Sequence, residues 1–132
     1  MAQQVETAFA EMLDISTDID KAVLVGPAGV VASNMTEEAQ GKATGQVREL
    51  VLLAETRSAE MGSQPLTQLV IETPSGYVFF ARETGSDSLA MLATGKTGSR
   101  VGLVLYDLRT CMRDAREAMG AETLDSEATT ED

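Results

Sequence analysis

The chain has 132 residues and a formal net charge of −11, with a single cysteine and no histidine. A chain of this length forms one domain that buries enough surface to need no disulfide staples. The acidic balance excludes a nucleic-acid partner, which requires clustered Lys and Arg, and disfavours an anionic membrane surface. One cysteine and no histidine leave too few ligands for a zinc site. We therefore expect no metal and no cofactor. Because no segment is typical of a signal peptide or a membrane span, we also expect a cytoplasmic protein.

The N-terminal segment predicts a short amphipathic helix with one buried stripe. The stripe consists of Val5, Ala8, Phe9, Met12 and Leu13. A polar stretch then ends the helical pattern, and we interpret its carboxylates as solvated and exposed. These are Asp14, Asp18 and Asp20.

Two short strands follow, at Ala22–Val25 and Val30–Ser33. Both are continuous apolar runs, which is typical of a sheet that is covered on both faces. Pro27 and Gly29 lie between them and indicate a tight turn. We therefore expect the two strands to fold back on each other as a hairpin.

A long helix is predicted from the N-cap residue Thr36 to about Glu60. Its stripe consists of Ala39, Ala43, Val47, Leu50, Val51 and Ala54. Leu52 and Leu53 widen the apolar arc beyond what one sheet face needs, which predicts a second partner for this helix. Two glycines one turn apart, Gly41 and Gly45, either permit close approach by another helix or mark a frayed first half.

Three further strands are predicted at Leu66–Glu72, Tyr77–Arg82 and Leu89–Ala93, with a tight turn at Pro74-Ser75-Gly76 after the first. A last helix is expected from the N-cap residue Ser99 to Gly120. Its apolar stripe consists of Val101, Val104, Leu105, Leu108, Cys111, Met112, Ala115 and Met119. A cysteine on this stripe, with no histidine to activate it, predicts a buried apolar thiol and not a nucleophile.

The segment 121–132 is acidic and has no basic residue, so we expect a domain over 1–120 followed by a disordered tail over 121–132. Gly95-Lys96-Thr97 lacks the glycine cradle of a phosphate-binding loop, and we interpret it as a strand-to-helix connection. No base with a tuned partner is visible, so we expect no enzyme and no catalytic residue.

The order of the elements and three local phrases resemble the Roadblock/LC7 domain family, which includes gliding-motility regulators of Ras-like small GTPases. The phrases are Ala22–Val25 with Gly29–Ser33, then Leu69–Tyr77 (Leu-Val-Ile-Glu-Thr-Pro-Ser-Gly-Tyr), then Gly102–Arg109. The resemblance covers about Val5 to Ala118. It implies an α/β (α+β) fold of profilin-like type, α-β-β-α-β-β-β-α, with a five-stranded antiparallel sheet between one long helix and two terminal helices. It also implies that the small Gly102 lets the last helix lie close to the sheet.

The resemblance further implies a homodimer in which the third strands pair edge to edge and the long helices pack side by side. Such pairing satisfies the free N–H and C=O groups of an apolar edge strand, which otherwise favours aggregation, and a two-fold axis closes it. The expected dimer contacts come from the long helix and the third strand: Val47, Leu50, Val51, Ala54, Leu66, Gln68, Val70 and Glu72.

The implied function is regulation or scaffolding of a Ras-like small GTPase, either as a GTPase-activating protein or as a tether. We expect Arg48, Leu52 and Arg57 on the long helix to contact this partner, whereas the simpler interpretation of the arginines is that they snorkel at the surface. The alternative function is ligand sensing by a profilin- or PAS-like domain without enzymatic activity, which requires an internal pocket.

Overall fold

A computed structural model describes residues 2–85 and 87–131, and over this part the helices and strands follow the predicted order. The helices are α1 (Ala2–Ile15), α2 (Glu37–Met61) and α3 (Val101–Glu131). The strands are β1 (Ile19–Gly26), β2 (Gly29–Ser33), β3 (Gln68–Thr73), β4 (Gly76–Arg82) and β5 (Ala90–Gly95). The predicted fold class is confirmed. Two strand starts were predicted too early, because Leu66 lies in the linker before β3 and Leu89 lies before β5.

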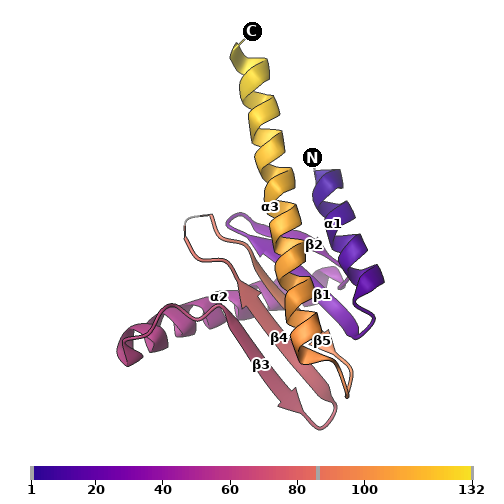
Figure 1. Cartoon of the computed structure of the whole chain (residues 1–132), viewed down its shortest axis with the longest axis vertical. Helices are drawn as coiled ribbons and strands as arrows, with labels where there is room; N and C mark the ends of the chain where they lie inside the picture. Colours follow the sequence, from indigo (N-terminus) through magenta and orange to yellow (C-terminus); the bar gives the residue numbers. More distant parts are fainter. Residues whose placement is uncertain (1, 86, 132) are drawn as a thin grey trace.

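The five strands form one antiparallel sheet in the order β2-β1-β5-β4-β3. The hairpin β1–β2 and the meander β3–β4–β5 meet only where β1 pairs with β5, as in Val23 opposite Leu92. Figure 1 shows β3 at one edge of the sheet with no described element beside it. One edge therefore presents backbone groups to solvent along an apolar strand.

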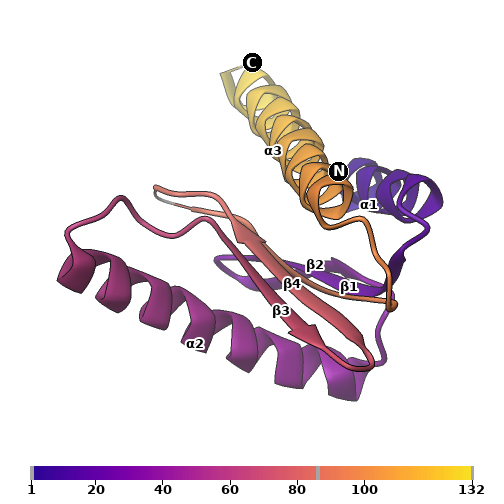
Figure 2. The same ribbon diagram turned by 60° about the horizontal axis from the view of Figure 1, so that its bottom comes forward.

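Helices cover both faces of the sheet, as the continuous apolar strands predicted. Figure 2 shows α2 crossing one face and the pair α1 and α3 lying on the other. The alternation of a strand divides its side chains between these layers. On β4, for example, Phe79 packs in the cluster under α1 and α3, whereas Phe80 packs in the cluster under α2.

The ends of α2 have the caps that its sequence predicted. The Thr36 hydroxyl accepts a hydrogen bond from the backbone N–H of Ala39, and Glu37 and Glu38 place negative charge on the first turn. Gly62 closes the helix in the left-handed region, at φ 68°, and donates its N–H to Ala59 O.

Asp18, and not the predicted Ser99, caps the N-terminus of α3. Its carboxylate accepts from the backbone N–H of Arg100 at 2.9 Å, whereas the Ser99 hydroxyl donates to Lys96 O. Asp18 is only 5% exposed, so its interpretation as a solvated carboxylate is also wrong. The fold brings the carboxylate of a loop residue to the start of α3, and the local sequence around α3 could not predict this contact.

Two further features of α3 differ from the sequence prediction. Gly102 is exposed, and a Cβ built there meets nothing within 4 Å, so this glycine does not bring α3 close to the sheet. The helix also continues through Gly120 to Glu131, and Figure 1 shows these last turns projecting past the sheet. The disordered tail concerns the chain in solution and stays a prediction.

Within the described residues, no helix combines the length and the apolar character that a membrane crossing requires.

Candidate interaction surfaces

The open edge strand β3 presents different side chains to the two faces of the sheet. Leu69 lies opposite Phe80 and Ile71 opposite Val78, so both point to the α2 face. Three of the predicted dimer residues, Gln68, Val70 and Glu72, alternate with them and therefore lie on the α1–α3 face.

Glu72 is engaged within its own chain. The hydroxyl of Tyr77 donates to Glu72 Oε2 at 3.0 Å, and this hydrogen bond raises the pKa of Tyr77 above its ordinary value. A partner that used Glu72 would compete with this contact.

A groove of about 650 Å³ lies between α2 and the sheet, and Ile71 is the one residue of β3 in its wall. We call it the β3-side groove. Its apolar wall is formed mainly by Leu50, Leu53, Ile71, Val78 and Leu92. Ile71 and Leu53 both line this groove and are 43% and 48% exposed, so two large aliphatic side chains face solvent in it. This groove adjoins the unpaired strand edge.

A second groove, of about 480 Å³, lies on the opposite side of α2, toward the β1–β2 turn. We call it the turn-side groove. Arg48, Val51 and Leu52 contribute to its wall, and Pro27 closes the far side. Leu52 is 69% exposed, and Arg48 makes no ion pair with any described residue. The wall therefore combines an exposed leucine with an unpaired guanidinium.

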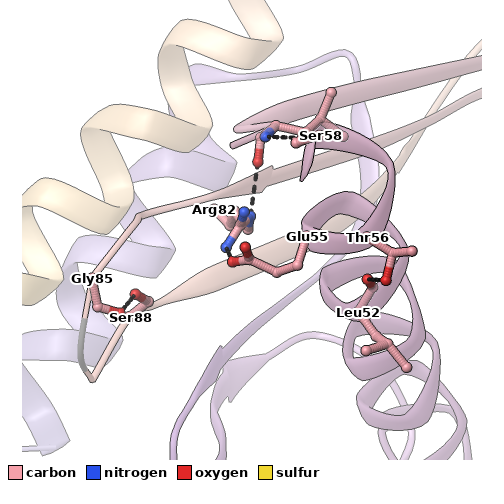
Figure 3. Close-up of polar contacts among 8 residues, drawn as sticks. Leu52, Glu55, Thr56, Ser58, Arg82, Gly85 and Ser88 are labelled. Atoms are coloured by element: carbon pink, nitrogen blue, oxygen red, sulfur yellow. Dashed lines mark hydrogen bonds and ion pairs between the residues drawn. The ribbon is translucent and has the colours of Figure 1, made fainter. Parts of the chain in front are cut away.

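A buried arginine fixes α2 and the linker that leads to β3. Arg82, at the end of β4, donates from Nη1 to Glu55 of α2 at 3.0 Å and from Nε to Leu66 O at 2.8 Å. Leu66 in turn donates its backbone N–H to the Ser58 hydroxyl at 3.0 Å. Figure 3 shows Glu55 pointing from α2 toward Arg82, whereas Leu52 points away. We call Arg82, Glu55, Ser58 and Leu66 the Arg82 clamp.

The clamp borders the turn-side groove, because both Arg82 and Glu55 contribute to its wall. The Arg82 side chain is 5% exposed and Glu55 is 55% exposed, so the pair joins the interior to the surface of α2. This deeply buried charge is paired through Nη1 and hydrogen-bonded through Nε, whereas its Nη2 atom is buried without a hydrogen-bond partner among the described residues. The linker before the open edge strand is therefore tied to the helix that borders both grooves.

The structure separates the predicted site residues on α2 into four groups. Val47 and Ala54 are each 3% exposed and pack under α2 in their own chain, so they do not reach the surface. Leu50 lies in the β3-side groove, whereas Arg48, Val51 and Leu52 meet in the turn-side groove. Arg57 follows Leu53 by one helical turn and pairs with Glu60 at 2.7 Å, so it is not part of the Arg48 group.

Sequence reasoning did not select Leu53, Leu69 and Ile71 for the dimer contact. A signal for these residues was present in the sequence. Leu53 belongs to the wide apolar arc of α2, and the alternation of side chains along β3 places Leu69 and Ile71 on one face. Which of the two alternating sets shares a face with α2 follows from pairing with β4, which the sequence does not display.

Two residues weighed as reactive groups have structural roles. Lys96 lies 3.4 Å from Asp18 Oδ1, which agrees with a strand-to-helix connection at Gly95-Lys96-Thr97. Cys111 is buried in the α1–α3 cluster, and burial raises the pKa of its thiol to about 12. The prediction that this thiol is buried is confirmed.

No protein-family model matches the sequence, and no curated protein sequence matches it. Solved structures do match. A Roadblock/LC7 domain from Streptomyces avermitilis superposes with a TM-score of 0.75 at 14% identity, covering 86% of this chain and 96% of that chain. Myxococcus xanthus MglB gives 0.73 at 8% identity, covering 89% and 95%. The gliding protein MglB from Thermus thermophilus gives 0.60 at 13% identity, covering 87% and 90%.

Geometry and comparisons together define the class of this protein. It is an α+β domain whose open antiparallel sheet lies between one long helix and a pair of terminal helices. Its fold is that of the Roadblock/LC7 domains and the MglB gliding proteins.

Proposed function

We propose that this chain is a homodimeric regulatory or scaffold protein that binds a Ras-like small GTPase and modulates its switch state or its localisation. The observation that carries the proposal is the apolar strip of Leu53 and Ile71 beside the unpaired edge of β3. The small-GTPase partner comes from the family resemblance, which the fold comparisons support.

The dimer joins two β3 edges into one continuous sheet, with the two α2 helices on the same face. Edge pairing satisfies the free backbone groups of β3, and the two-fold axis gives each β3-side groove the apolar surface of the other copy. Leu50, Leu53, Leu69 and Ile71 are the contact residues. One matching structure, at TM-score 0.71 and 14% identity, is described as MglB with a tetrameric arrangement, so chains with this fold do assemble.

The GTPase contacts the turn-side groove. Arg48 and Leu52 lie one helical turn apart on α2, with Val51 beside them. An arginine next to exposed leucine is the composition that energetic anchors of interfaces favour. The two grooves lie on opposite sides of α2, so the proposed dimer contact in the β3-side groove leaves the turn-side groove open to a partner.

Light scattering on the purified chain tests the dimer. We expect a dimer at tens of micromolar, and Leu53→Asp and Ile71→Asp should each weaken it on the order of 30-fold or more, as loss of a buried anchor does. Leu52→Asp is the matched control, because it places the same charge on the other side of the same helix. A monomeric parent chain, or a dimer that survives both substitutions, would contradict the proposal.

Binding assays with the small GTPases of the same cell, loaded with GDP or with a non-hydrolysable GTP analogue, test the partner. We expect one to bind in a nucleotide-dependent manner, with Arg48→Glu and Leu52→Asp abolishing binding in a chain that stays folded and dimeric. Arg57→Glu should reduce binding less. Phosphate release in the same mixture separates a GTPase-activating protein from a tether. Unchanged binding by both groove variants would overturn the assignment of the surface.

A ligand-sensing function requires an internal pocket. The grooves described above open onto the surface, and buried side chains from both sheet faces fill the two clusters between the layers. Nothing in the described residues favours this alternative over partner binding.

A further inference from the structure

Asp107 is a buried carboxylate without a partner. It lies on α3, is 8% exposed, and makes no hydrogen bond or ion pair with any described residue, while its Oδ2 atom is fully enclosed. A carboxylate removed from water without a donor lowers stability, so proteins usually pair such a group or replace it. The free protein therefore carries a destabilising group that a cationic partner would neutralise.

Asp107 lines a small hollow in the seam between α1 and α3. The hollow has a volume of about 50 Å³, and its lining includes Glu11 and Ile15 from α1 with Asp107, Thr110 and Asp114 from α3. A single water occupies about 30 Å³ of liquid, so this space suits one ammonium or guanidinium group and no cofactor. Two more carboxylates, Glu11 and Asp114, line it, and Asp114 is paired with Arg113 at 3.5 Å, so Glu11 supplies most of the remaining negative charge of the rim.

One exposed apolar side chain lines the hollow, and two more exposed side chains lie on α3 outside its lining. Ile15 is 70% exposed and lines it, while Leu103, one helical turn before Asp107, is 41% exposed. The neighbouring Tyr106 is 57% exposed. Apolar and aromatic groups around one buried charge resemble the anchor of a protein interface more than a solvated helix face.

We propose that this seam binds a lysine or arginine side chain of a protein partner, with the charged group on Asp107 and a neighbouring apolar residue on Ile15 and Leu103. The charge of the seam selects a basic segment. A bare divalent cation fits poorly, because no group of three or more acidic, Cys or His residues among those described could hold a metal ion.

The seam is independent of the proposed GTPase and dimer surfaces. Figure 2 shows α1 and α3 on the sheet face opposite α2. A partner in the seam leaves both grooves beside α2 uncovered. The chain would thus hold two different proteins at once, and the seam contact does not depend on the proposed function.

Amide NMR spectra of the labelled full chain with butylguanidinium chloride test the site, with sodium chloride and butanol as reference titrations. We expect saturable shifts confined to Ile15, Asp107 and Thr110, and Asp107→Asn should weaken binding by about tenfold, since a charge-assisted hydrogen bond is lost. Asp20→Asn, a change of the same charge at an exposed site, should bind like the parent chain. Shifts that are absent, diffuse, or unchanged in Asp107→Asn would overturn the proposal, as would tighter binding of Mg²⁺ or Ca²⁺ at the same amides.

A peptide extends this test to a macromolecular partner. An amidated helical peptide with Arg and Leu four residues apart should bind the seam, and the same peptide with Gln in place of Arg should bind at least about tenfold more weakly. Equal binding of the two peptides would contradict the assignment of the cationic group.

Thermal unfolding separates this role from a structural one. Because Asp107 is unpaired, Asp107→Asn and Asp107→Leu should raise the Tm of the free chain, on the order of 4 °C for a domain of this size. A structural carboxylate would give the opposite sign. If both variants lower Tm, Asp107 has a partner within its own chain and the proposal fails.

Discussion

Asp18 and Arg100 join the start of β1 to the start of α3. Asp18 Oδ2 accepts from the backbone N–H of Arg100 at 2.9 Å and from its Nε at 3.1 Å, and Lys96 lies 3.4 Å from the other oxygen. The backbone N–H of Arg100, followed by its guanidinium and Lys96, holds the pKa of Asp18 below its ordinary 3.8, although burial opposes the shift. One carboxylate thus caps a helix and connects two elements.

We expect Asp18→Asn to lower the Tm at neutral pH, on the order of 5 °C. Because the folded-state pKa of Asp18 is depressed, its contribution is present above about pH 3.8 and is lost as pH falls below that value. The Tm difference between parent and variant should therefore shrink below about pH 3.8. Thermal unfolding followed by circular dichroism from pH 2 to pH 7 measures it. Asp20→Asn, at an exposed position, should change Tm little at any pH, and a difference that grows on acidification would contradict the role of Asp18.

The Arg82 clamp predicts an unusually large effect for a half-exposed glutamate. Glu55→Ala leaves the buried guanidinium of Arg82 without its counterion, so we expect a loss of about 1–3 kcal/mol in the free energy of unfolding. Urea titration at neutral pH measures this loss.

Glu117→Ala removes an exposed glutamate from α3 and serves as the control, with an expected change within about 0.5 kcal/mol. Equal effects of the two substitutions would show that Arg82 does not depend on Glu55.

Gly76 and Gly41 should respond to alanine with opposite signs. Gly76 has φ +146°, and a Cβ there would lie 2.3 Å from Gly95 O, a backbone atom of the neighbouring strand, so Gly76→Ala should cost about 2–4 kcal/mol. Gly41 lies in α2 with nothing within 4 Å, so Gly41→Ala should stabilise the monomer by about 0.5–1 kcal/mol.

Denaturant titrations of the two variants give both values. Adding light scattering to the Gly41 variant decides between the two interpretations of its glycine. A weakened dimer would mean close helix approach, and an unchanged dimer would mean a frayed segment. Destabilisation of the monomer by Gly41→Ala would contradict the open surroundings of this residue.

Ending the chain after Gly120 tests the tail. The last turns of α3 project past the sheet, so we expect removal of 121–132 to leave Tm within about 2 °C of the parent value. If the tail is disordered in solution, the truncated chain keeps all the helical circular dichroism of the parent. A lost helical signal at unchanged Tm would instead support a helix that extends to Glu131.

The sequence predicted the order and type of all elements, because long apolar stripes and turn residues are local signals. The roles of Thr36 as an N-cap and of Cys111 as a buried thiol could be predicted from the neighbouring residues alone. Asp18 could not, because its partner Arg100 is distant in sequence and a polar stretch with three aspartates is usually solvated. The local sequence pattern therefore predicts a helix, but it does not predict a capping side chain that comes from a distant segment of the chain.

The same limit applies to the candidate surfaces. The apolar character of β3 predicted an open edge, and the wide arc at Leu50–Leu53 predicted a second partner for α2. The faces of β3 were not predictable, because both alternating sets contain apolar residues and only the register against Phe80 and Val78 separates them. Gly102 was misinterpreted because a small residue at a helix start also occurs at an exposed position.

The strand order also determines how this chain folds. The meander of β3, β4 and β5 forms from neighbouring segments, whereas β1 reaches β5 only after the whole of α2 and the meander have been synthesised. The entropy of closing such a large loop opposes the pairing of β1 with β5, which slows folding relative to a fold with only local contacts. We therefore expect the pairing of β1 with β5, such as Val23 opposite Leu92, to form late in folding, while β1 is already paired with its neighbour β2.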